Sequence, residues 1–313
     1  FLAHGETPAS PEFGNCVLKA IKKLIEYVEQ GGGYVPEGKA YSHGIVTYAL
    51  AEAYALTKIP MLEDTVNKAV ARIVAGQSSL GGFNYHYNNG DILEDGKPRQ
   101  DLSVSGWSFQ ALKAAFAGGS TVSGVEQGIE KGIEGIKKIW HKENGGFGYT
   151  RPEEERDTMT AVGTLCLQLL GDGKSKEAQS GLKTLESKFF NFDWDAGQQW
   201  FLYRTYYQTQ AHFQGNEGKG PKWNQWNKMF STTLVKKQFD DGHWETPASM
   251  KGAEGHGEGM FKGIDMPVWA TSFSLLMLQV YYRYLPTFQV VEARAAEAAA
   301  PTTTPEDTGL NIE

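Results

Sequence analysis

The stretch from Trp194 to Trp226 combines many aromatic side chains with one arginine, and it has the strongest potential for chemistry in the sequence. Aromatic rings beside a guanidinium can stack on a sugar and hydrogen-bond to it, or stabilise a positive charge on a ligand. Core packing and an aromatic, partly polar ligand pocket are both open for these side chains. The candidate pocket residues are Trp200, Tyr203, Arg204, Tyr206 and Tyr207.

Two acidic residues, Asp193 and Asp195, directly precede most of these rings and are candidate catalytic residues. A carboxylic acid that donates a proton in catalysis needs neighbours that shift its pKa. Asp before a helix is also an ordinary cap. Capping, proton donation and ligand contact therefore remain alternatives for this pair. His43, at the start of a predicted helix, has its own two alternatives: a cap or core role, and a role in a central cavity.

Metal chemistry has little support in the sequence. The seven histidines form neither a His-x-x-x-His nor a Glu-x-x-His pair. The two cysteines, Cys16 and Cys166, exclude a disulfide framework and a Cys-rich zinc site. We therefore expect no metal site and no cofactor.

The charge balance argues against nucleic acid as a partner. The chain carries 37 acidic and 30 basic residues, for a formal net charge of −7. Binding to a phosphate backbone requires clustered Lys and Arg, and no basic stripe is present. No apolar run reaches the ~18 residues that a membrane span needs, so we expect no span.

Two kinds of helical segment alternate along the chain. One kind is apolar or small nearly all round, as buried helices are, and the other carries Lys and Glu on one face only. This alternation predicts an all-α fold, an α/α toroid in which an inner ring of helices is wrapped by an outer ring. The inner segments are 42–57, 102–117, 158–171, 198–213 and 267–283, and the outer ones are 14–30, 62–76, 122–140, 174–189 and 221–237.

A glycine–aromatic loop recurs between these segments. Three copies share one spacing, a polar residue followed by Gly four positions later and an aromatic residue six positions later: Gln77 to Phe83, His141 to Phe147 and Gln238 to Trp244. Gly32 to Tyr34 is a shorter copy, and a degenerate unit surrounds Trp194. The inner segments also align with one another, at His43, Ser105, Thr160, Thr205 and Thr271. Self-similarity of this kind predicts a repeat fold of five units of roughly fifty residues.

The two ends complete the predicted organisation. The chain opens with an outer-type segment, so we expect its inner partner to precede Phe1, which would make six inner helices, an (α/α)6 barrel. Residues 1–290 are predicted to form the toroid domain, and 291–313 a flexible tail rich in Ala, Thr and Pro. Gly252 to Gly263 is a Gly-rich insertion that we expect to form a loop on one rim. Asp101, Asp157 and Asp265 precede inner segments and are predicted caps.

The repeats resemble those of the prenyltransferase and squalene–hopene cyclase superfamily. The run from Gln238 to Trp244 is similar to the Gln-Trp repeat of the cyclases, and the Gly-Gly-Phe loops are similar to those of protein prenyltransferase β subunits. The runs 206–211 and 222–229 look like bacterial repeat proteins of this superfamily, which usually carry no assigned activity. The resemblance covers about residues 14 to 285 and implies a toroid with a central apolar cavity.

The catalytic residues that the resemblance implies are missing or incomplete. The cyclase Asp-x-Asp-Asp motif has its nearest match at Asp193 to Ala196, one acid short. The zinc ligands of the prenyltransferases include an Asp two residues before a Cys, but Thr164 precedes Cys166 and Gly14 precedes Cys16. The Asp-Asp-x-x-Asp motif of the class I synthases and the thioester motif of the complement-like relatives are also absent.

Three functional hypotheses follow. The first is a non-catalytic toroid that binds an apolar or glycan ligand in its central cavity, or a protein partner on its rim. The second is an isoprenoid cyclase with Asp193 or Asp195 as the proton donor. The third is a carbohydrate-active α/α-toroid enzyme. The tail resembles linkers of exported bacterial proteins, which favours a periplasmic or cell-envelope location.

Overall fold

The computed structural model describes residues 1–35, 40–87, 92–93, 95–96, 98–196, 200–247, 266–282 and 287. Within these ranges the chain forms α-helices, two short 3-10 turns and no strand beyond two isolated bridges, which confirms the all-α prediction. The even-numbered helices are α2 (Ala40–Thr57), α4 (Leu102–Ala117), α6 (Asp157–Leu169), α8 (Phe201–Gly215) and α10 (Met266–Leu278). The odd-numbered helices are α1 (Gly14–Gln30), α3 (Pro60–Ala75), α5 (Val125–Lys138), α7 (Lys176–Ser187) and α9 (Gly220–Lys237), and the 3-10 turns are η1 (Leu2–His4) and η2 (Pro152–Glu154).

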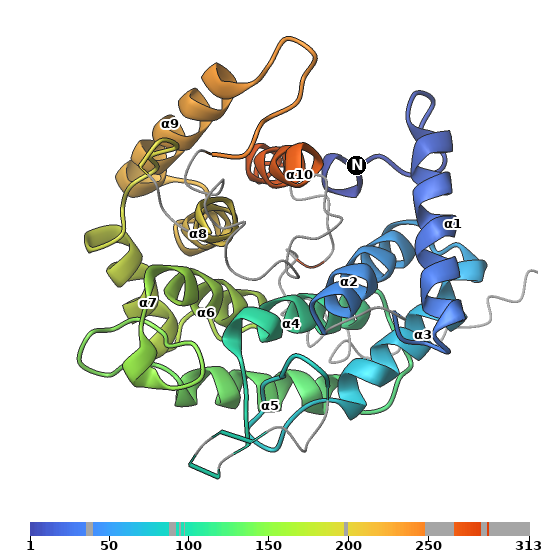
Figure 1. Cartoon of the computed structure of the whole chain (residues 1–313), viewed down its shortest axis with the longest axis horizontal. Helices are drawn as coiled ribbons and strands as arrows, with labels where there is room; N and C mark the ends of the chain where they lie inside the picture. The colour runs from blue at the N-terminus through green and yellow to red at the C-terminus, as the bar shows by residue number, and fades with distance from the viewer. Residues whose placement is uncertain are drawn as a thin grey trace, which may run out of the picture.

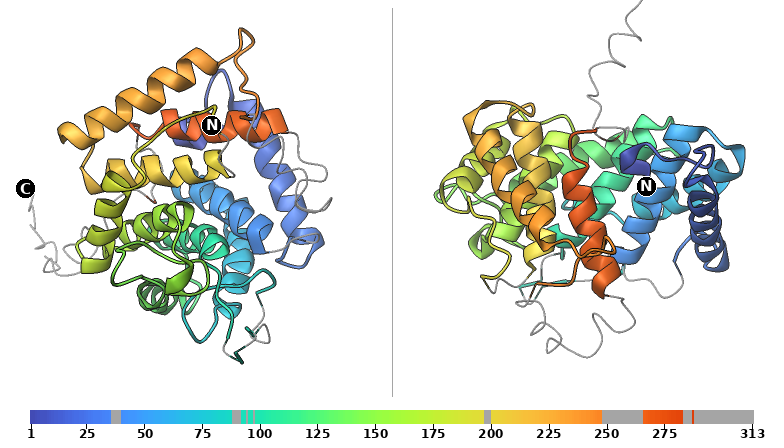
Figure 2. Two further views of the ribbon diagram at one scale, coloured as in Figure 1. Left: turned by 60° about the vertical axis from the view of Figure 1, so that its left-hand side comes forward. Right: turned by 90° about the horizontal axis from the view of Figure 1, so that it is seen from above.

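The helices lie in two curved layers (Figure 1). The even-numbered helices form the inner row, in which each packs on the next along the chain from α2 to α10. Each odd-numbered helix from α3 to α9 packs on the inner helix before it, and α1 packs on α2 and α3. The view from above shows the helices of the two layers side by side (Figure 2). The predicted inner and outer segments thus match the helices of each layer, while a closed ring of six pairs remains a prediction.

Small residues allow the inner helices to approach closely. A Cβ added at Gly44 on α2 would lie 3.2 Å from the Cβ of Trp107 on α4. One added at Gly106 on α4 would lie 2.7 Å from Val162 on α6, closer than carbon atoms normally come. Every residue of α4 from Leu102 to Ala115 is buried, as is every residue of α8 from Phe201 to Phe213. Contact on all sides explains why these helices lack a polar stripe.

The recurring loop has the same hydrogen bonds in each full copy. Its glycine adopts a left-handed conformation, with φ of 104°, 86° and 92° at Gly81, Gly145 and Gly242, where side chains with a Cβ are disfavoured. The aromatic residue two positions later is buried at Phe83, Phe147 and Trp244, and its N–H donates to a hydroxyl of the following inner helix. These bonds are Phe83 to Ser105 (2.9 Å), Phe147 to Thr160 (3.1 Å) and Trp244 to Thr271 (3.0 Å).

The polar residue that opens two of these loops also has a structural role. The side-chain amides of Gln77 and Gln238 donate to the carbonyls of Gly81 and Gly242, at 2.7 and 2.9 Å. The spacing seen in the sequence is therefore the spacing of one turn closed by side-chain and backbone hydrogen bonds.

Two of the predicted acidic caps lie at helix starts. The Asp101 side chain caps α4 by accepting from the Ser103 N–H at 3.0 Å. Asp157 is the first residue of α6 and accepts from the Thr158 N–H at 2.7 Å. Asp265, the insertion at Gly252 to Gly263 and the tail at 291–313 lie outside the described residues.

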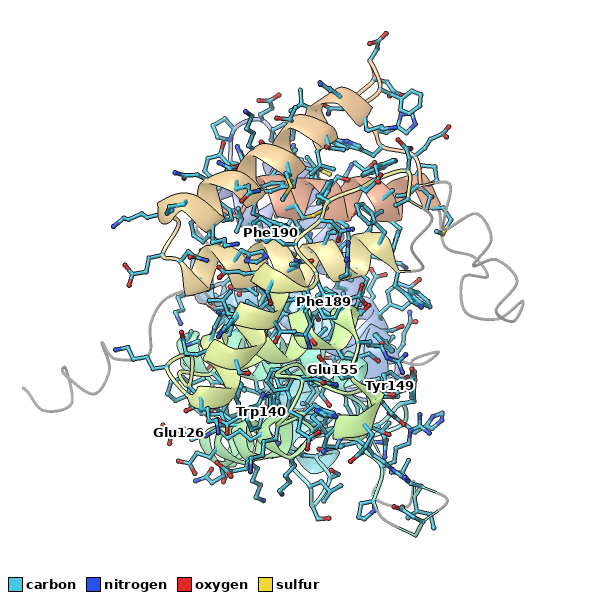
Figure 3. All side chains as sticks on the ribbon, turned by 90° about the vertical axis from the view of Figure 1, so that its left-hand side faces the viewer. Glu126, Trp140, Tyr149, Glu155, Phe189 and Phe190 are labelled. Carbon is cyan, nitrogen blue, oxygen red and sulfur yellow. The ribbon has the colours of Figure 1, made fainter. Side chains whose placement is uncertain are left out.

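The segment between α7 and α8 anchors the outer layer on the inner one (Figure 3). The ring of Phe190 packs against His212 of α8, with centroids 5.3 Å apart, and against Trp226 of α9 at 5.5 Å. None of the described helices combines the length and apolar character needed to cross a bilayer.

Candidate functional site

The aromatic residues of α8 form contacts between helices in the core. The hydroxyl of Tyr203 donates to the Ser103 carbonyl of α4 at 2.9 Å. The hydroxyl of Tyr206 donates to the Gln110 side-chain oxygen at 3.1 Å, and the hydroxyl of Tyr207 accepts from the Gln110 nitrogen at 3.1 Å. All three rings are buried. The hydroxyls that suggested a wet pocket are therefore paired with groups of α4, which favours the core-packing alternative.

Arg204 is held by the protein itself. Its side chain is 2% exposed and donates to Asp157 and to the Asn191 side chain, both at 3.2 Å, and to the Asn191 carbonyl at 3.2 Å. Burial lowers the pKa of the guanidinium, and Asp157 opposes that shift. Trp200 precedes α8 with a positive φ of 63° and is only partly buried, so of the five candidates it is the one with appreciable exposure.

Asp193 and Asp195 do not face an enclosed cavity. Both are exposed, and Asp195 forms an ion pair with Lys237 of α9 at 2.8 Å, while Asp193 accepts from the Asp195 N–H at 3.0 Å. Of the three alternatives for this pair, their positions favour the turn or cap, because a solvated carboxyl in a surface turn lacks the enclosed, acidifying surroundings that alkene protonation requires.

His43 packs between the two layers. It is fully buried, and its Nε2 lies 3.0 Å from the Ala69 carbonyl of α3, to which it donates. Burial lowers the pKa of the ring to about 4. The ring also packs on Tyr34, with centroids 4.8 Å apart. His43 thus meets the aromatic residue of the first loop, as Ser105 and Thr160 meet theirs, and the core role accounts for its position.

The structure instead assembles a polar site at the ends of the inner helices. α2 and α4 run in parallel, because the close approaches of Gly44 to Trp107 and of Ala55 to Gly118 have the same offset in sequence. α8 runs in the same direction as α4, because Tyr203 meets Ser103 and Tyr206 meets Gln110. Their N-termini therefore gather at one end of the molecule. We name the cluster there the tyrosine rim: Tyr41 of α2, Tyr85 and Tyr149 of two connecting segments, and Arg99 and Asp101 before α4.

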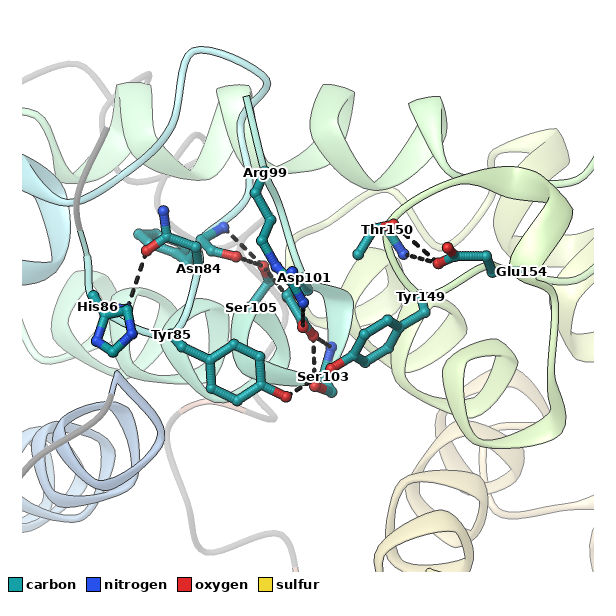
Figure 4. A network of polar contacts seen from close by, with 11 residues as sticks. Asn84, Tyr85, His86, Arg99, Asp101, Ser103, Ser105, Tyr149, Thr150 and Glu154 are labelled. Atoms are coloured by element: carbon teal, nitrogen blue, oxygen red, sulfur yellow. Dashed lines mark hydrogen bonds and ion pairs between the residues drawn. The ribbon is translucent and has the colours of Figure 1, made fainter. Parts of the chain in front are cut away.

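Two tyrosine hydroxyls meet above a buried carboxyl in the tyrosine rim (Figure 4). Tyr85 and Tyr149 lie 2.6 Å apart through their Oη atoms, across 64 residues of sequence. Asp101 is fully buried, and its Oδ1 accepts from the Ser103 hydroxyl at 2.6 Å. Its Oδ2 lies 3.6 Å from Arg99. Burial raises the pKa of Asp101, whereas Ser103, Tyr149 and Arg99 oppose the shift.

The rings of this cluster are partly exposed and stacked with cations. Tyr41 and Tyr85 lie 5.6 Å apart between ring centroids, and Arg99 lies 5.8 Å over Tyr85. Arg156 lies 5.2 Å over Tyr149. Tyr149 and Glu155 lie toward the same end of the molecule in Figure 3. Partly exposed aromatic rings, hydroxyls and charged groups together can stack on a ligand and hydrogen-bond its polar groups.

The tyrosine rim was missed in the sequence, although a signal is present. Tyr85 and Tyr149 each follow a loop aromatic by two positions, so that Phe83-x-Tyr85 and Phe147-x-Tyr149 repeat. Asp101 was identified only as a cap, which it also is. A search for polar aromatics at fixed offsets from the repeat would have placed both tyrosines at the same end of the molecule.

In the described parts of the chain, His, Cys, Asp and Glu side chains form no cluster of three or more that could hold a metal ion. The absence of a bound cofactor in the chain remains a prediction.

Comparison with known proteins does not identify a family. No protein-family model matches the sequence, and no curated protein is significantly similar to it. The resemblance to the cyclase and prenyltransferase repeats therefore remains a prediction from the residues alone.

Proposed function

We propose that this chain is a non-catalytic binding module that takes a glycan at the tyrosine rim. The observation that carries the proposal is the paired hydroxyls of Tyr85 and Tyr149 above the buried Asp101 carboxyl. Sugar rings present apolar C–H faces and hydroxyl edges, and partly exposed tyrosines beside a carboxylate and guanidinium groups match both.

An apolar ligand fits this rim less well. Covering the partly exposed Arg99 with a lipid would remove its remaining solvent without supplying a hydrogen bond, which costs free energy. A glycan hydroxyl can replace that solvent at the guanidinium. The buried Asp101 carboxyl, 3.6 Å from Arg99, adds negative charge that favours a positively charged guanidinium at this position.

The enzyme alternatives have weaker support. A glycosidase normally requires two carboxyls flanking one bond, one of them a raised-pKa acid. The residues named in the tyrosine rim include one carboxyl, that of Asp101. Burial raises its pKa, but its Oδ1 already accepts from Ser103. The isoprenoid cyclase hypothesis depended on Asp193 or Asp195, and both carboxyls are exposed.

The test measures binding to a panel of immobilised neutral and acidic oligosaccharides, followed by calorimetry with any oligosaccharide that binds. Tyr149→Ala and Tyr85→Ala should each weaken binding about tenfold or more, because each removes a stacking face and a hydroxyl. Tyr27→Ala is the matched control, since Tyr27 is a 42%-exposed tyrosine on α1 in the outer layer. Its affinity should equal that of the wild type.

Three outcomes would contradict the proposal. If no oligosaccharide of the panel binds, the glycan ligand is wrong. Equal affinity of the rim variants and the wild type would place the site elsewhere. Chromatographic detection of cleaved or modified oligosaccharide after prolonged incubation would contradict the non-catalytic part.

A further inference from the structure

Two charged residues are buried in the inner row, away from the tyrosine rim. Glu52 on α2 is 1% exposed, and Lys113 on α4 is 2% exposed. Residues of α2 and α4 that lie side by side are 63 positions apart in sequence, as the pairs Gly44–Trp107 and Ala55–Gly118 show. Lys113 is therefore level with Leu50, about half a helical turn from Glu52. The two side chains therefore share one level of the inner layer, nearer the C-terminal ends of its helices.

Aromatic rings separate these charges from the tyrosine rim. Trp107 of α4 stacks on Tyr206 of α8, with centroids 5.6 Å apart and 12° between planes. Its ring also lies 6.5 Å from Tyr48 of α2 and 6.4 Å from Phe273 of α10. We name these four rings the central cluster. Because they come from four inner helices, the inner row converges on them.

The partner of Glu52 comes from the far end of the chain. Thr287 is 1% exposed, and its N–H donates to Glu52 Oε1 at 3.3 Å. Its hydroxyl donates to the same oxygen. These bonds join residues 235 positions apart, and they connect the chain that follows the last inner helix to the first inner helix.

α2 and α10 are the first and last helices of the inner row. α10 packs on α8. Ile45 of α2 remains 41% exposed, and Leu275 of α10 remains 39% exposed. Both end helices therefore keep an exposed apolar side chain. The Glu52–Thr287 contact joins the first helix of the row to the chain that follows the last.

The electrostatic surroundings of Glu52 fit a hydrogen-bonding role. Burial raises the pKa of its carboxyl to about 8, and Thr287, Tyr48 and Lys113 oppose the shift. Burial also lowers the pKa of Lys113 to about 8, opposed by Glu52. Tyr206 of α8 faces the same carboxyl. A group this costly to bury is seldom retained without a specific role.

We propose that Glu52 is a latch that holds Thr287 and thereby ties the end of the inner row to its beginning. The latch is independent of the glycan site, because it lies on the other side of the central cluster. Glu52 recognises Thr287 through the N–H and O–H of that one residue. Loss of this contact disconnects the two ends of the row.

Limited proteolysis of the full chain tests the latch. Trypsin cleaves after Arg283, which lies in the sequence between α10 and Thr287. It also cleaves after Arg294, which follows Thr287, and this second site serves as an internal reference. In the wild type we expect cleavage after Arg283 to be slower than after Arg294. Thr287→Val removes the hydroxyl at nearly constant volume and should raise the Arg283 rate about tenfold relative to Arg294. Thr287→Ser keeps the hydroxyl and should retain the protection.

Variants of Glu52 provide the second arm. Glu52→Gln keeps a side-chain oxygen that can accept from Thr287, so cleavage after Arg283 should be as slow as in the wild type. Glu52→Leu removes both oxygens, so cleavage after Arg283 should become faster. Circular dichroism establishes that each variant is folded before cleavage is compared. Equal cleavage rates in Thr287→Val and the wild type, or a wild type cleaved as fast after Arg283 as after Arg294, would overturn the latch.

Discussion

The tyrosine rim and the latch region both place charged groups inside a helical scaffold, but they differ in access to solvent. At the rim, Arg99 is 31% exposed, and the tyrosine hydroxyls satisfy each other. At the latch, Glu52 is 1% exposed, and its carboxyl is surrounded by Thr287, Tyr48 and Lys113. At the rim, a ligand can replace the water around Arg99 at little cost in free energy. The latch region depends on the chain's own atoms for every interaction.

This contrast separates groups that affect binding from groups that affect stability. A partly exposed polar group keeps water as an alternative partner, so its removal costs little in folding. A buried group has no such alternative, and its protonation state becomes coupled to folding. Variants at the rim should therefore change affinity, and variants near the latch should change the free energy of unfolding.

The largest expected effect is at the central cluster. Trp107→Ala should lower the free energy of unfolding by about 3–5 kcal/mol, because it leaves a cavity where rings from α2, α8 and α10 meet. Urea denaturation followed by circular dichroism measures the change. A loss below about 1 kcal/mol would mean that the ring is not packed as the structure has it.

The pH dependence of stability should report Glu52. Its pKa rises from 4.5 to about 8 on folding, so the folded state binds more protons between these values. The resulting stabilisation is fully present below pH 4.5 and is lost as the pH rises toward 8, on the order of a few kcal/mol. Glu52→Gln should lack this loss. Urea denaturation of the wild type and of Glu52→Gln at several pH values between about 5 and 8 measures the difference. The lowered pKa of His43 affects the stability of both proteins equally, so it cancels in this comparison. Parallel curves would contradict the raised pKa.

The repeated loops should respond alike. Ser105→Ala and Thr160→Val each leave a buried aromatic N–H without its acceptor, which should cost about 1–3 kcal/mol in each case. Thr205→Val is the informative control and should cost less. Among the described residues, the Thr205 hydroxyl donates only to carbonyls of the preceding turn of α8. Thermal unfolding measures all three. Unequal costs at Ser105 and Thr160 would argue that the two loops are not equivalent.

The smallest stability effect is expected at the rim. Tyr85→Phe removes one hydroxyl of the Tyr85–Tyr149 pair and should cost about 0.5–1.5 kcal/mol or less in unfolding free energy. The loss of binding free energy for a glycan should be larger than this loss of unfolding free energy. A strong loss of stability without a loss of affinity would reverse the roles assigned to the two regions.

The helices and loops could be predicted because their signals are local. The absence of a polar stripe identified α4 and α8 as buried, and the spacing from Gln77 to Phe83 identified a turn that needs a left-handed glycine and a buried ring. Helical periodicity and turn chemistry depend on residues a few positions apart, so the sequence contains them directly. Glu52 and Lys113 were missed in the sequence, although each is a charged residue in an otherwise mostly apolar helix.

Tertiary structure alone decided which of these residues meet. Tyr85 reaches Tyr149 across 64 residues and Glu52 reaches Thr287 across 235, and both contacts depend on the curvature of the helix rows and on the register between helices. The same factors determine that Asp195 lies at the surface beside Lys237 and that the Tyr206 hydroxyl contacts Gln110. Sequence spacing fixes the face of a helix on which a side chain lies, whereas the packing of neighbouring helices decides what that face touches.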